Sequence, residues 1–268
     1  MDSQISVVTV CFNVVDSIEK TILSVINQTY QNIEYIIIDG GSTDGTVDII
    51  KKYADYITYW VSEPDKGIYD AMNKSLNYLN GDFVLFLNSG DTFYTVETVS
   101  LVFSNHEYSK EIDVIYGDTK YVMKWGWYEL IPDKIEKMNI RCPFCHQSAF
   151  IRTHSILLYR YDIRYKFAAD YNLFHTMWKE GHKMTYVPIT LSIFDGSIPS
   201  FSVRHPFLVR KEEMAISNGK TLKSKLALIR VFLRAIASKL LLFIPISAYI
   251  RNKRFKNNPL IKSYSIFE

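Results

Sequence analysis

The chain has 268 residues, of which 48% are hydrophobic and 22% charged, and this composition excludes global disorder. Its length suits one large domain, or one domain with appendages. The formal net charge of +3 is unevenly distributed, because residues 214–267 carry eleven Lys and Arg and no Asp or Glu. A basic, apolar tail on an acidic body predicts an anionic surface as the partner of the tail.

The start of the chain predicts a cytoplasmic protein. Residues 1–4 contain no Lys or Arg, and the apolar run of residues 5–10 is too short for a signal peptide. Three cysteines, an odd number, fit a reducing compartment.

Strand and helix patterns alternate through the first ninety residues. Runs of apolar and β-branched residues predict strands over residues 5–10, 33–38, 56–61 and 83–87. Apolar residues at helical spacing predict the intervening helices, which begin near Asp16 or Ser17, near Val47 and at Gly67. Three successive βαβ units indicate a doubly wound α/β sheet.

Polar side chains follow three of these strands. Asp39 ends the second strand, the charged residues of 63–66 follow the third, and Asn88 and Asp91 follow the fourth. Because the carboxyl ends of parallel strands meet at one edge of a sheet, these residues predict a nucleotide site there. The alternative is a set of well-capped loops, in which Asp91 caps a helix.

Three motifs carry a family resemblance. Residues 39–46, 62–74 and 86–91 resemble, in order, the successive motifs of family 2 glycosyltransferases with the GT-A fold. Within that family the chain resembles the branch that builds capsular and colanic-acid-type exopolysaccharides, over roughly residues 5–195.

The resemblance implies a fold and a domain plan. The expected fold is α/β, with one Rossmann-like, mixed, mainly parallel sheet flanked by helices and a C-terminal helical extension. Residues 1–205 would form the GT-A domain, with a nucleotide-sugar half (1–92) and an acceptor half (93–205). Residues 206–268 would form a basic amphipathic helical tail.

The resemblance also implies a donor site with a divalent cation. Asp39 would contact the nucleobase, and Asp91 would bind Mn²⁺ or Mg²⁺ as the last position of the family's DxD-type motif. Asn88 and Gly90 stand where many relatives carry aspartates, but one carboxylate plus phosphate oxygens can still hold Mg²⁺. The residues expected to bind the nucleotide-sugar are Val10, Phe12, Asn13, Asp39, Ser42, Asp44, Glu63, Lys66, Gly67, Asp70, Asn73, Asn88, Ser89 and Gly90. For Asp70 and Asn73 the alternative is a solvated helix face.

The second half begins with a predicted helix over residues 95–109 and strands over 112–116 and 119–130, around a turn at Gly117-Asp118. Residues 142–146 then match a CxxCH string. Haem attachment is disfavoured because no export signal is present, and zinc because no second ligand pair exists. A redox role is disfavoured because the motif does not follow the first strand of a thioredoxin-like unit. The resemblance instead implies that His146 and Gln147 contact the acceptor or the diphosphate, with a structural histidine as the alternative.

The segment after residue 167 carries the expected catalytic base. Asp170 opens a predicted helix, where it could serve as a cap. The resemblance implies instead that Asp170 removes the acceptor hydroxyl's proton in an inverting transfer. Strands are predicted over residues 183–187 and 191–194, followed by a loop over 195–200, and the resemblance implies that this loop is a mobile lid over the donor. Beyond the lid, Arg204 is a candidate for the diphosphate and His205 for an extra metal ligand.

The tail has the pattern of a membrane-surface helix. Apolar residues recur at helical spacing from Leu222 to Leu240, and the uncharged run 240–250 is too short to span a bilayer, which needs about 20 residues. Residues 221–256 are therefore expected to bind the anionic inner face of the plasma membrane peripherally. The alternatives are a helix packed on the body or a homodimer interface. Nucleic acid is disfavoured, because the basic residues are interleaved with long aliphatic ones.

The sequence thus predicts an inverting glycosyltransferase. It would move a sugar from a UDP- or GDP-sugar to a hydroxyl of a lipid-linked oligosaccharide, in bacterial surface polysaccharide biosynthesis. A sugar nucleotidyltransferase is an alternative, although residues 11–13 are not the Gly-rich, Arg-bearing phosphate loop that it needs. A catalytically silent, membrane-associated nucleotide-sugar-binding protein is the other, because Asn88 and Gly90 depart from the acidic motif.

Overall fold

The computed structural model describes residues 3–104, 108–197, 204–217, 229, 255–256 and 258–266. The first elements are β1 (Ile5–Cys11), α1 (Val15–Ile26), β2 (Ile33–Asp39), α2 (Thr46–Lys52), β3 (Tyr59–Ser62), α3 (Ile68–Ser75), β4 (Phe83–Phe86), β5 (Thr92–Phe93) and α4 (Thr98–Phe103). The later elements are β6 (Ile112–Met123), β7 (Gly126–Leu130), β8 (Ala149–Arg152), α5 (Thr153–Tyr159), α6 (Ala169–Lys179), β9 (Lys183–Asp195), α8 (Pro206–Ile216) and β10 (Ile261–Ile266). Short 3₁₀ turns lie at residues 54–56, 76–78, 135–139 and 146–148.

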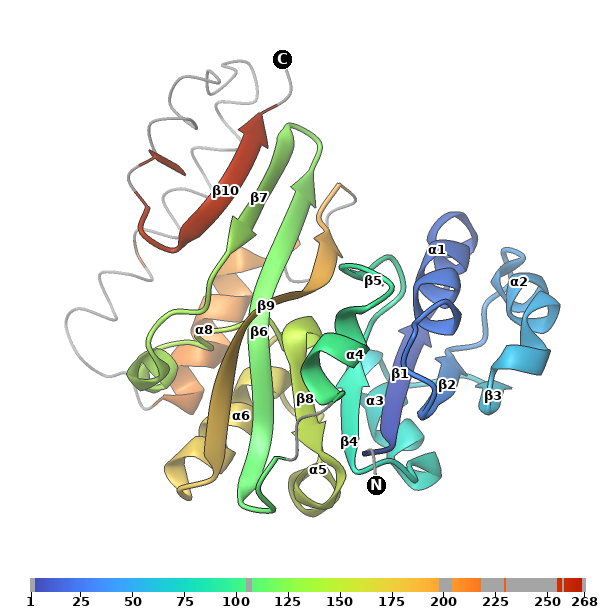
Figure 1. Ribbon diagram of the computed structural model, residues 1–268, viewed down its shortest axis with the longest axis horizontal. Helices are drawn as coiled ribbons and strands as arrows, with labels where there is room; N and C mark the ends of the chain where they lie inside the picture. The colour runs from blue at the N-terminus through green and yellow to red at the C-terminus, as the bar shows by residue number, and fades with distance from the viewer. Residues whose placement is uncertain are drawn as a thin grey trace.

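The strands form one mixed sheet (Figure 1). Their order is β10-β7-β6-β8-β4-β1-β2-β3, and β9 pairs with β6 and β5. β4, β1, β2 and β3 run parallel, since helices connect them across the faces of the sheet. β8 lies antiparallel between β4 and β6, so both halves of the chain contribute to the same sheet.

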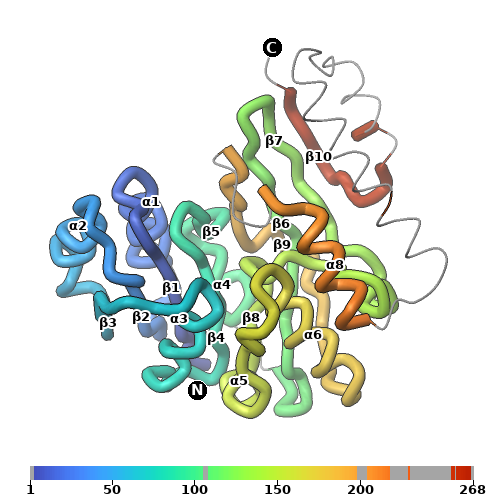
Figure 2. The backbone as a smooth tube through the Cα atoms, turned by 180° about the vertical axis from the view of Figure 1, so that it is seen from behind, coloured from blue at the N-terminus to red at the C-terminus, as the bar shows by residue number. Residues whose placement is uncertain are grey.

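Helices cover both faces of the sheet and bury two separate cores. α1, α2 and α4 pack on one face, over side chains that include Val7 and Ile37. α3, α5, α6 and α8 pack on the other face, over Val8 and Ile36, and lie toward the viewer in Figure 2. Val7 and Val8 are adjacent in β1 and both fully buried, as expected for a parallel strand covered on both sides.

The N-terminal elements match their predicted positions, with two local differences. β3 begins at Tyr59 rather than at residue 56, because residues 54–56 form a 3₁₀ turn. α1 begins at Val15, so Asp16 and Ser17 lie within its first turn instead of capping it.

The first N–H groups of α1 are satisfied by the loop after β2. Val14 N–H donates to Thr46 Oγ1 (2.9 Å), and Val15 N–H donates to Asp44 Oδ2 (3.0 Å). Asp44 also accepts from the N–H of Thr46 (3.0 Å), at the start of α2. Asp44 therefore accepts from the first N–H of both α1 and α2, which fixes the loops after β1 and β2 against each other.

β6 and β9 are long continuous strands, so the predicted turn at Gly117-Asp118 is wrong. A Cβ on Gly117 would lie 2.4 Å from the carbonyl oxygen of Ile189, and glycine lets β9 approach β6 this closely. Asp118 is buried in the strand and accepts hydrogen bonds from Tyr186 Oη (2.7 Å) and Lys262 Nζ (3.1 Å). The pairing of β6 with β9 shifts register beside Gly117.

The predicted helical tail is wrong for residues 261–266. Residues 206–216 do form a helix, α8, but residues 261–266 form β10, which pairs antiparallel with β7 and lies at the edge of the sheet. Lys262 of β10 donates a hydrogen bond to Asp118 of β6. Gly126 of β7 leaves room for the backbone of β10, because a Cβ at this position would lie 2.1 Å from the carbonyl oxygen of Ser265. Most of residues 221–256 lie outside the described residues. Within the described part of the chain, no helix is long and apolar enough to cross a membrane.

Candidate active site

Two cavities adjoin at the carboxyl ends of β1 and β4. The first has a volume of about 480 Å³ and the second about 400 Å³. Four residues line both cavities: Ile68, Asn88, Gln147 and Phe194. Ligands held in the two cavities would therefore meet beside Asn88 and Gln147.

The cavities bring together about half of the predicted site residues. Those that line the first cavity are Val10, Phe12, Gly67, Asn88, Ser89, Gly90, Asp91 and Gln147. Those that line the second are Asn88, His146, Gln147 and Asp170. The predicted donor residues outside both linings are Asn13, Asp39, Ser42, Asp44, Glu63, Lys66, Asp70 and Asn73.

Asp39 is fully buried, and its carboxylate holds the loop that follows β2. It accepts hydrogen bonds from the N–H groups of Gly41 (3.1 Å) and Ser42 (2.8 Å), and from the hydroxyl groups of Ser42 (2.5 Å) and Ser62 (2.6 Å). Burial acts to raise the pKa of Asp39, but the hydrogen bonds from Ser42 and Ser62 outweigh it and hold the pKa below its ordinary value. Asp39 therefore shapes the loop behind the first cavity, and its contact with a nucleobase stays a prediction.

Two further residues that were predicted to bind the nucleotide-sugar also order backbone loops. Asn13 has a positive φ of 51°, and its Oδ1 accepts from the N–H of Thr43 (2.9 Å). Asp70 accepts from the N–H of Lys66 (3.0 Å), which closes the loop before α3. The amide of Asn13 and the carboxylate of Asp70 thus set the shape of the loop after β2 and of the loop before α3.

Asn73 and Glu63 connect elements rather than facing a cavity. The side-chain amide of Asn73 donates to the carbonyl of Tyr161 (2.7 Å) and accepts from its N–H (2.9 Å), so both polar atoms are used. Glu63 forms an ion pair with Lys74 (2.7 Å). This amide ties α3 to the segment before α6, and the contact of Asn73 with a nucleotide-sugar stays a prediction.

Asp91 lies at the inner end of the first cavity and is only 5% exposed. Its Oδ2 accepts from Gln147 Nε2 (2.8 Å), and its Oδ1 accepts from the N–H of Asp195 (3.1 Å). Burial raises the pKa of Asp91 to about 6, against the opposing effect of these two hydrogen bonds. Asp91 thus connects the turn after β4 to the end of β9, which leads toward the predicted lid.

The turn after β4 fits a divalent cation. Asn88 Oδ1 is buried and has no hydrogen-bond partner among the described residues, and an amide oxygen is a ligand that Mg²⁺ and Mn²⁺ accept. The Asp91 carboxylate accepts two hydrogen bonds and retains further lone pairs. No group of three or more His, Cys, Asp or Glu that could hold a metal occurs among the described residues, so phosphate oxygens of a ligand would have to complete the coordination.

Asp170 lines the second cavity from the first turn of α6. Its Oδ1 accepts from the Tyr69 hydroxyl (3.1 Å), and its Oδ2 lies 3.2 Å from His146 Nδ1. Burial acts to raise the pKa of Asp170, but the hydrogen bond from His146 outweighs it, so the pKa lies below its ordinary value. The position near the helix N-terminus also favours an ionised carboxylate. Asp170 is therefore an ionised carboxylate in the lining of the second cavity, and its role as the base stays a prediction.

Aromatic side chains form much of the second cavity. Tyr121 and Tyr128 stack across β6 and β7 with ring centroids 5.0 Å apart and planes 5° apart. Phe144 and Phe167 add two more rings to the lining. Stacked, rigid rings suit the apolar faces of a sugar.

Several cavity residues were missed from the sequence. Tyr69 lies in the motif of residues 62–74, where the predicted binding residues nearest to it are Gly67 and Asp70. On a helix, adjacent residues point about 100° apart, so Tyr69 reaches Asp170 while Asp70 faces the preceding loop. Lys166, which also lines the second cavity, had no sequence signal beyond lying near Asp170.

Arg204 and His205 lie at the start of α8. His205 packs edge-on against Phe167, with ring centroids 5.5 Å apart, and Phe167 lines the second cavity. The structure therefore associates His205 with the cavity of Asp170, and its role as a metal ligand stays a prediction. Arg204 is exposed beside it.

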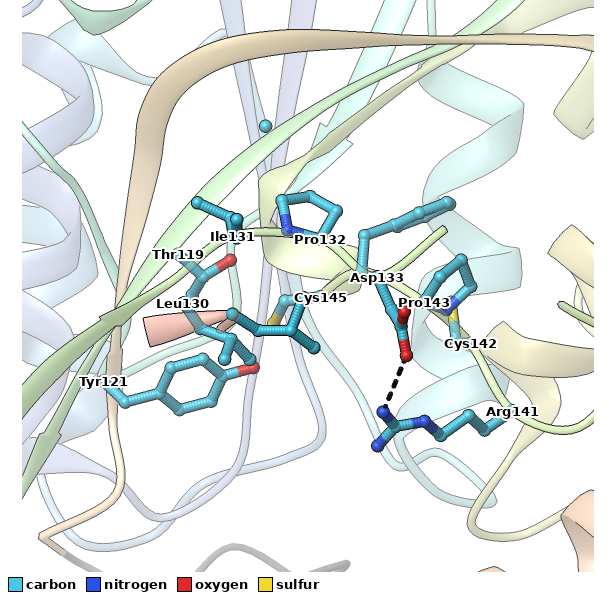
Figure 3. Close-up of a pocket in the computed structure, with 13 residues that line it drawn as sticks. Thr119, Tyr121, Leu130, Ile131, Pro132, Asp133, Arg141, Cys142, Pro143 and Cys145 are labelled. Carbon is cyan, nitrogen blue, oxygen red and sulfur yellow. Dashed lines mark hydrogen bonds and ion pairs between the residues drawn. The ribbon is translucent and has the colours of Figure 1, made fainter. Parts of the chain in front are cut away.

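The CxxC cysteines line a third, smaller cavity of about 160 Å³ (Figure 3). Cys142 and Cys145 lie on one side of it, with Thr119 and Tyr121 opposite and an ion pair between Arg141 and Asp133 (3.1 Å) at its edge. Burial raises the pKa of Cys145 to about 12 and that of Cys142 well above its ordinary value. Both are therefore neutral thiols at physiological pH.

Comparison of the sequence with known proteins gives one family. The model of "Glycosyl transferase family 2" matches residues 6–166. A PGL/p-HBAD biosynthesis glycosyltransferase of Mycobacterium bovis is 30% identical over 177 residues, which cover 62% of this chain and 66% of that protein. An uncharacterized glycosyltransferase of Mycobacterium tuberculosis is 42% identical over 97 residues, which cover 36% of this chain and 37% of that protein. The matches thus span about one third to two thirds of these relatives.

Comparison with solved structures supports the fold. S. aureus TarS 1–349 in complex with UDP-GlcNAc has a TM-score of 0.59 at 16% identity, covering 80% of this chain and 66% of that chain. The mannosyltransferase PcManGT from Pyrobaculum calidifontis, in complex with GDP-Man and Mn²⁺, has a TM-score of 0.60 at 14% identity, covering 95% and 80%. The predicted GT-A fold is confirmed, as a mixed sheet flanked by helices on both faces.

Proposed function

The chain belongs to glycosyl transferase family 2, and from this membership we propose that it moves one sugar from a UDP- or GDP-sugar to an acceptor hydroxyl. The observation that carries the proposal is the meeting of two cavities at Asn88. The first cavity offers a cation-binding turn for a nucleotide-sugar. The second offers Asp170 as a base for an acceptor.

The first cavity has the parts that a nucleotide-sugar needs. Phe12 is 59% exposed at the end of β1 and presents an apolar ring for a nucleobase. Ser89 and Gly90 lie in the turn after β4, and Gly90 has a φ of +98°, a conformation that favours glycine. Asn88 and Asp91 would hold Mn²⁺ or Mg²⁺ against the diphosphate. When bound, the cation would neutralise the charge of the departing nucleoside diphosphate.

The second cavity supports an inverting transfer. Asp170 accepts the proton of the acceptor hydroxyl as the hydroxyl oxygen bonds to the anomeric carbon. The nucleoside diphosphate leaves into the first cavity. Because attack and departure occur from opposite cavities, the configuration at the anomeric carbon inverts. The aromatic lining of Tyr121 and Tyr128 suits a glycan acceptor, and we place this acceptor on a lipid-linked oligosaccharide of a bacterial surface polysaccharide.

A donor panel tests this function. The purified chain is incubated with UDP- and GDP-sugars, with Mn²⁺ or with chelator, and both thermal stability and nucleoside diphosphate release are followed. Binding of the correct donor should raise the melting temperature by mass action, and release should need the cation. NMR of the product at its anomeric position should show inversion. Stabilisation without release would favour a silent binding protein. The absence of both stabilisation and release with every donor would contradict the proposal.

We also propose that residues 221–256 attach the protein to an anionic membrane. The support is the charge pattern, with no acidic residue between positions 214 and 267. A deletion of residues 221–268 is a poor test, because it also removes β10 from its pairing with β7. The better variant replaces the cluster Arg251, Lys253, Arg254 and Lys256 with glutamine.

The glutamine variant is expected to bind vesicles more weakly than the unmodified chain. Each basic residue near an anionic surface contributes about 1 kcal/mol, so four lost charges should lower partitioning by more than 100-fold. Sedimentation with phosphatidylserine vesicles at 0.1 M salt measures this, with phosphatidylcholine vesicles as the control. Equal sedimentation of both proteins would exclude the tail as the attachment site.

A further inference from the structure

His146 lines the second cavity and contacts both Asp170 and Asn88, and Asn88 lines the first cavity as well. Its Nδ1 lies 3.2 Å from Asp170 Oδ2, and its Nε2 lies 3.1 Å from Asn88 Nδ2. The imidazole is largely buried, with a side-chain exposure of 16%. One ring therefore connects the proposed base to the proposed cation-binding turn.

The hydrogen-bonding partners specify the tautomer of His146. The carboxylate of Asp170 can only accept, so Nδ1 must carry the hydrogen. The amide nitrogen of Asn88 can only donate, so Nε2 must accept. The chain of contacts is consistent only with the neutral Nδ1–H ring.

In the structure the Asn88 amide turns its Nδ2 toward this ring. Because Nδ2 is directed to His146, Oδ1 remains as the acceptor, and it is buried with no hydrogen-bond partner in the part of the chain that the structure describes. A buried amide oxygen without a partner is costly, unless a ligand supplies the missing contact. Asn88 lines the first cavity, so a cation or donor there could supply it.

The backbone that carries His146 is held firmly. His146 begins the 3₁₀ turn 146–148, which leads directly into β8 in the middle of the sheet. Ser148 Oγ donates to the Asp118 carbonyl (3.0 Å) and accepts from Thr119 Oγ1 (2.7 Å). The backbone that carries His146 is therefore held against β6 through Ser148, and Gln147 beside it also bonds to Asp91 in the turn that carries Asn88.

We propose that His146 is a positioning residue with two separable roles. Through Nδ1 it aims the Asp170 carboxylate at the acceptor cavity, and through Nε2 it turns Asn88 Oδ1 into a ligand for the cation. This inference rests on the proposed function. It assigns His146 to the protein's own hydrogen-bond chain, rather than to a direct contact with the diphosphate or the acceptor.

Two conservative substitutions separate the roles. The amide of asparagine occupies the position of Nδ1, so His146→Asn can keep the hydrogen bond to Asp170 and loses the hydrogen bond to Asn88. The amide of glutamine reaches the position of Nε2, so His146→Gln can keep the bond to Asn88 and loses Asp170. Each variant is thus the matched control for the other.

The two variants should fail in different measurements. In His146→Asn, calorimetry should show the affinity for Mn²⁺ with UDP or GDP reduced by about 10- to 100-fold, while kcat at saturating Mn²⁺ stays within about threefold of the unmodified chain. In His146→Gln, that affinity should stay within about threefold while kcat falls by about 10- to 100-fold. Equal losses of both quantities in the two variants, or no loss in either, would overturn the inference.

Tautomer detection supplies a test that needs no variant to fold. Nitrogen-15 NMR of histidine-labelled protein at pH 8 should show His146 with its proton on Nδ1, and a proton on Nε2 would overturn the inference. If the unmodified chain binds no nucleotide and releases none, the proposed function fails instead. The NMR result still reports the hydrogen-bond chain in that case, so the two failures are distinguishable.

Discussion

Replacing Asp170 with asparagine is expected to lower kcat by about 10²- to 10⁴-fold and to leave donor binding nearly unchanged. The amide cannot take up the acceptor's proton. Its oxygen can still accept a hydrogen bond from His146 Nδ1, and its nitrogen can donate to the Tyr69 hydroxyl, so the local structure should persist. The loss should therefore lie in the chemical step.

The measurement compares kcat with the affinity for UDP or GDP in the presence of Mn²⁺. Asp162→Asn is a suitable control, because this carboxylate pairs with Arg164 and lies outside the lining of both cavities. It should retain the activity of the unmodified chain. A fully active Asp170→Asn variant would show that another group removes the proton, and a variant that loses donor binding would show that Asp170 serves the first cavity.

The low pKa of Asp170 has a further consequence for the pH profile. A base that is ionised well below neutral pH does not itself limit activity between pH 5 and 8. Asp91, with a pKa of about 6, is the site carboxylate that changes charge in this range. We therefore expect the acid limb of the pH profile to report cation binding rather than proton removal.

The sequence predicted the scaffold of the site better than its contacts. The strands β1, β2 and β4 were located because their apolar runs are buried on both faces, a pattern that local sequence carries. The meeting of the two cavities depends on β8 inserting beside β4, and this antiparallel pairing joins residues about seventy positions apart. No local pattern reports such a pairing, so the proximity of His146 to Asn88 could not be derived.

The sequence also did not show which polar side chains are free to bind a ligand. Asp39 and Asn73 both lie in motifs of the family, and a carboxylate or amide at such a place can bind a ligand or the protein itself. In the structure Asp39 accepts a hydrogen bond from the hydroxyl of Ser62, and Asn73 accepts one from the backbone N–H of Tyr161. Both partners are distant in sequence. Whether a polar group is free for a ligand depends on these long-range hydrogen bonds, which residue type and spacing do not determine.

The affinity for Mn²⁺ with UDP or GDP is expected to fall about tenfold per unit as the pH drops below 6. Burial raises the pKa of Asp91 to about 6, and a protonated carboxyl group is a poor cation ligand. Calorimetry at pH 5, 6 and 7.5 measures the change. An affinity that stays constant across this range would remove Asp91 from the cation site.

Without a cation, the same raised pKa should make Asp91 destabilising at neutral pH. The folded chain keeps the proton of Asp91 up to about pH 6, whereas the unfolded chain releases it near pH 3.9. Between these values the folded state binds more protons, so the contribution of Asp91 to the free energy of unfolding falls as the pH rises. The shift of about two units corresponds to about 3 kcal/mol.

Other carboxylates act in the opposite direction, because the lowered pKa values of Asp39 and Asp170 give stability that is lost as the pH falls. We therefore compare the unmodified chain with an Asp91→Asn variant. Both proteins contain Asp39 and Asp170, so the contributions of these two carboxylates cancel in the difference. Urea unfolding in chelator at pH 4, 5 and 6.5 should therefore show the stability of the variant rising relative to the unmodified chain by up to about 3 kcal/mol with increasing pH. A difference that stays constant would mean that Asp91 ionises as readily in the folded chain as in the unfolded one. A difference that disappears on adding Mn²⁺ and UDP would link this cost to cation binding, because the ligand would then stabilise the ionised carboxylate that burial disfavours.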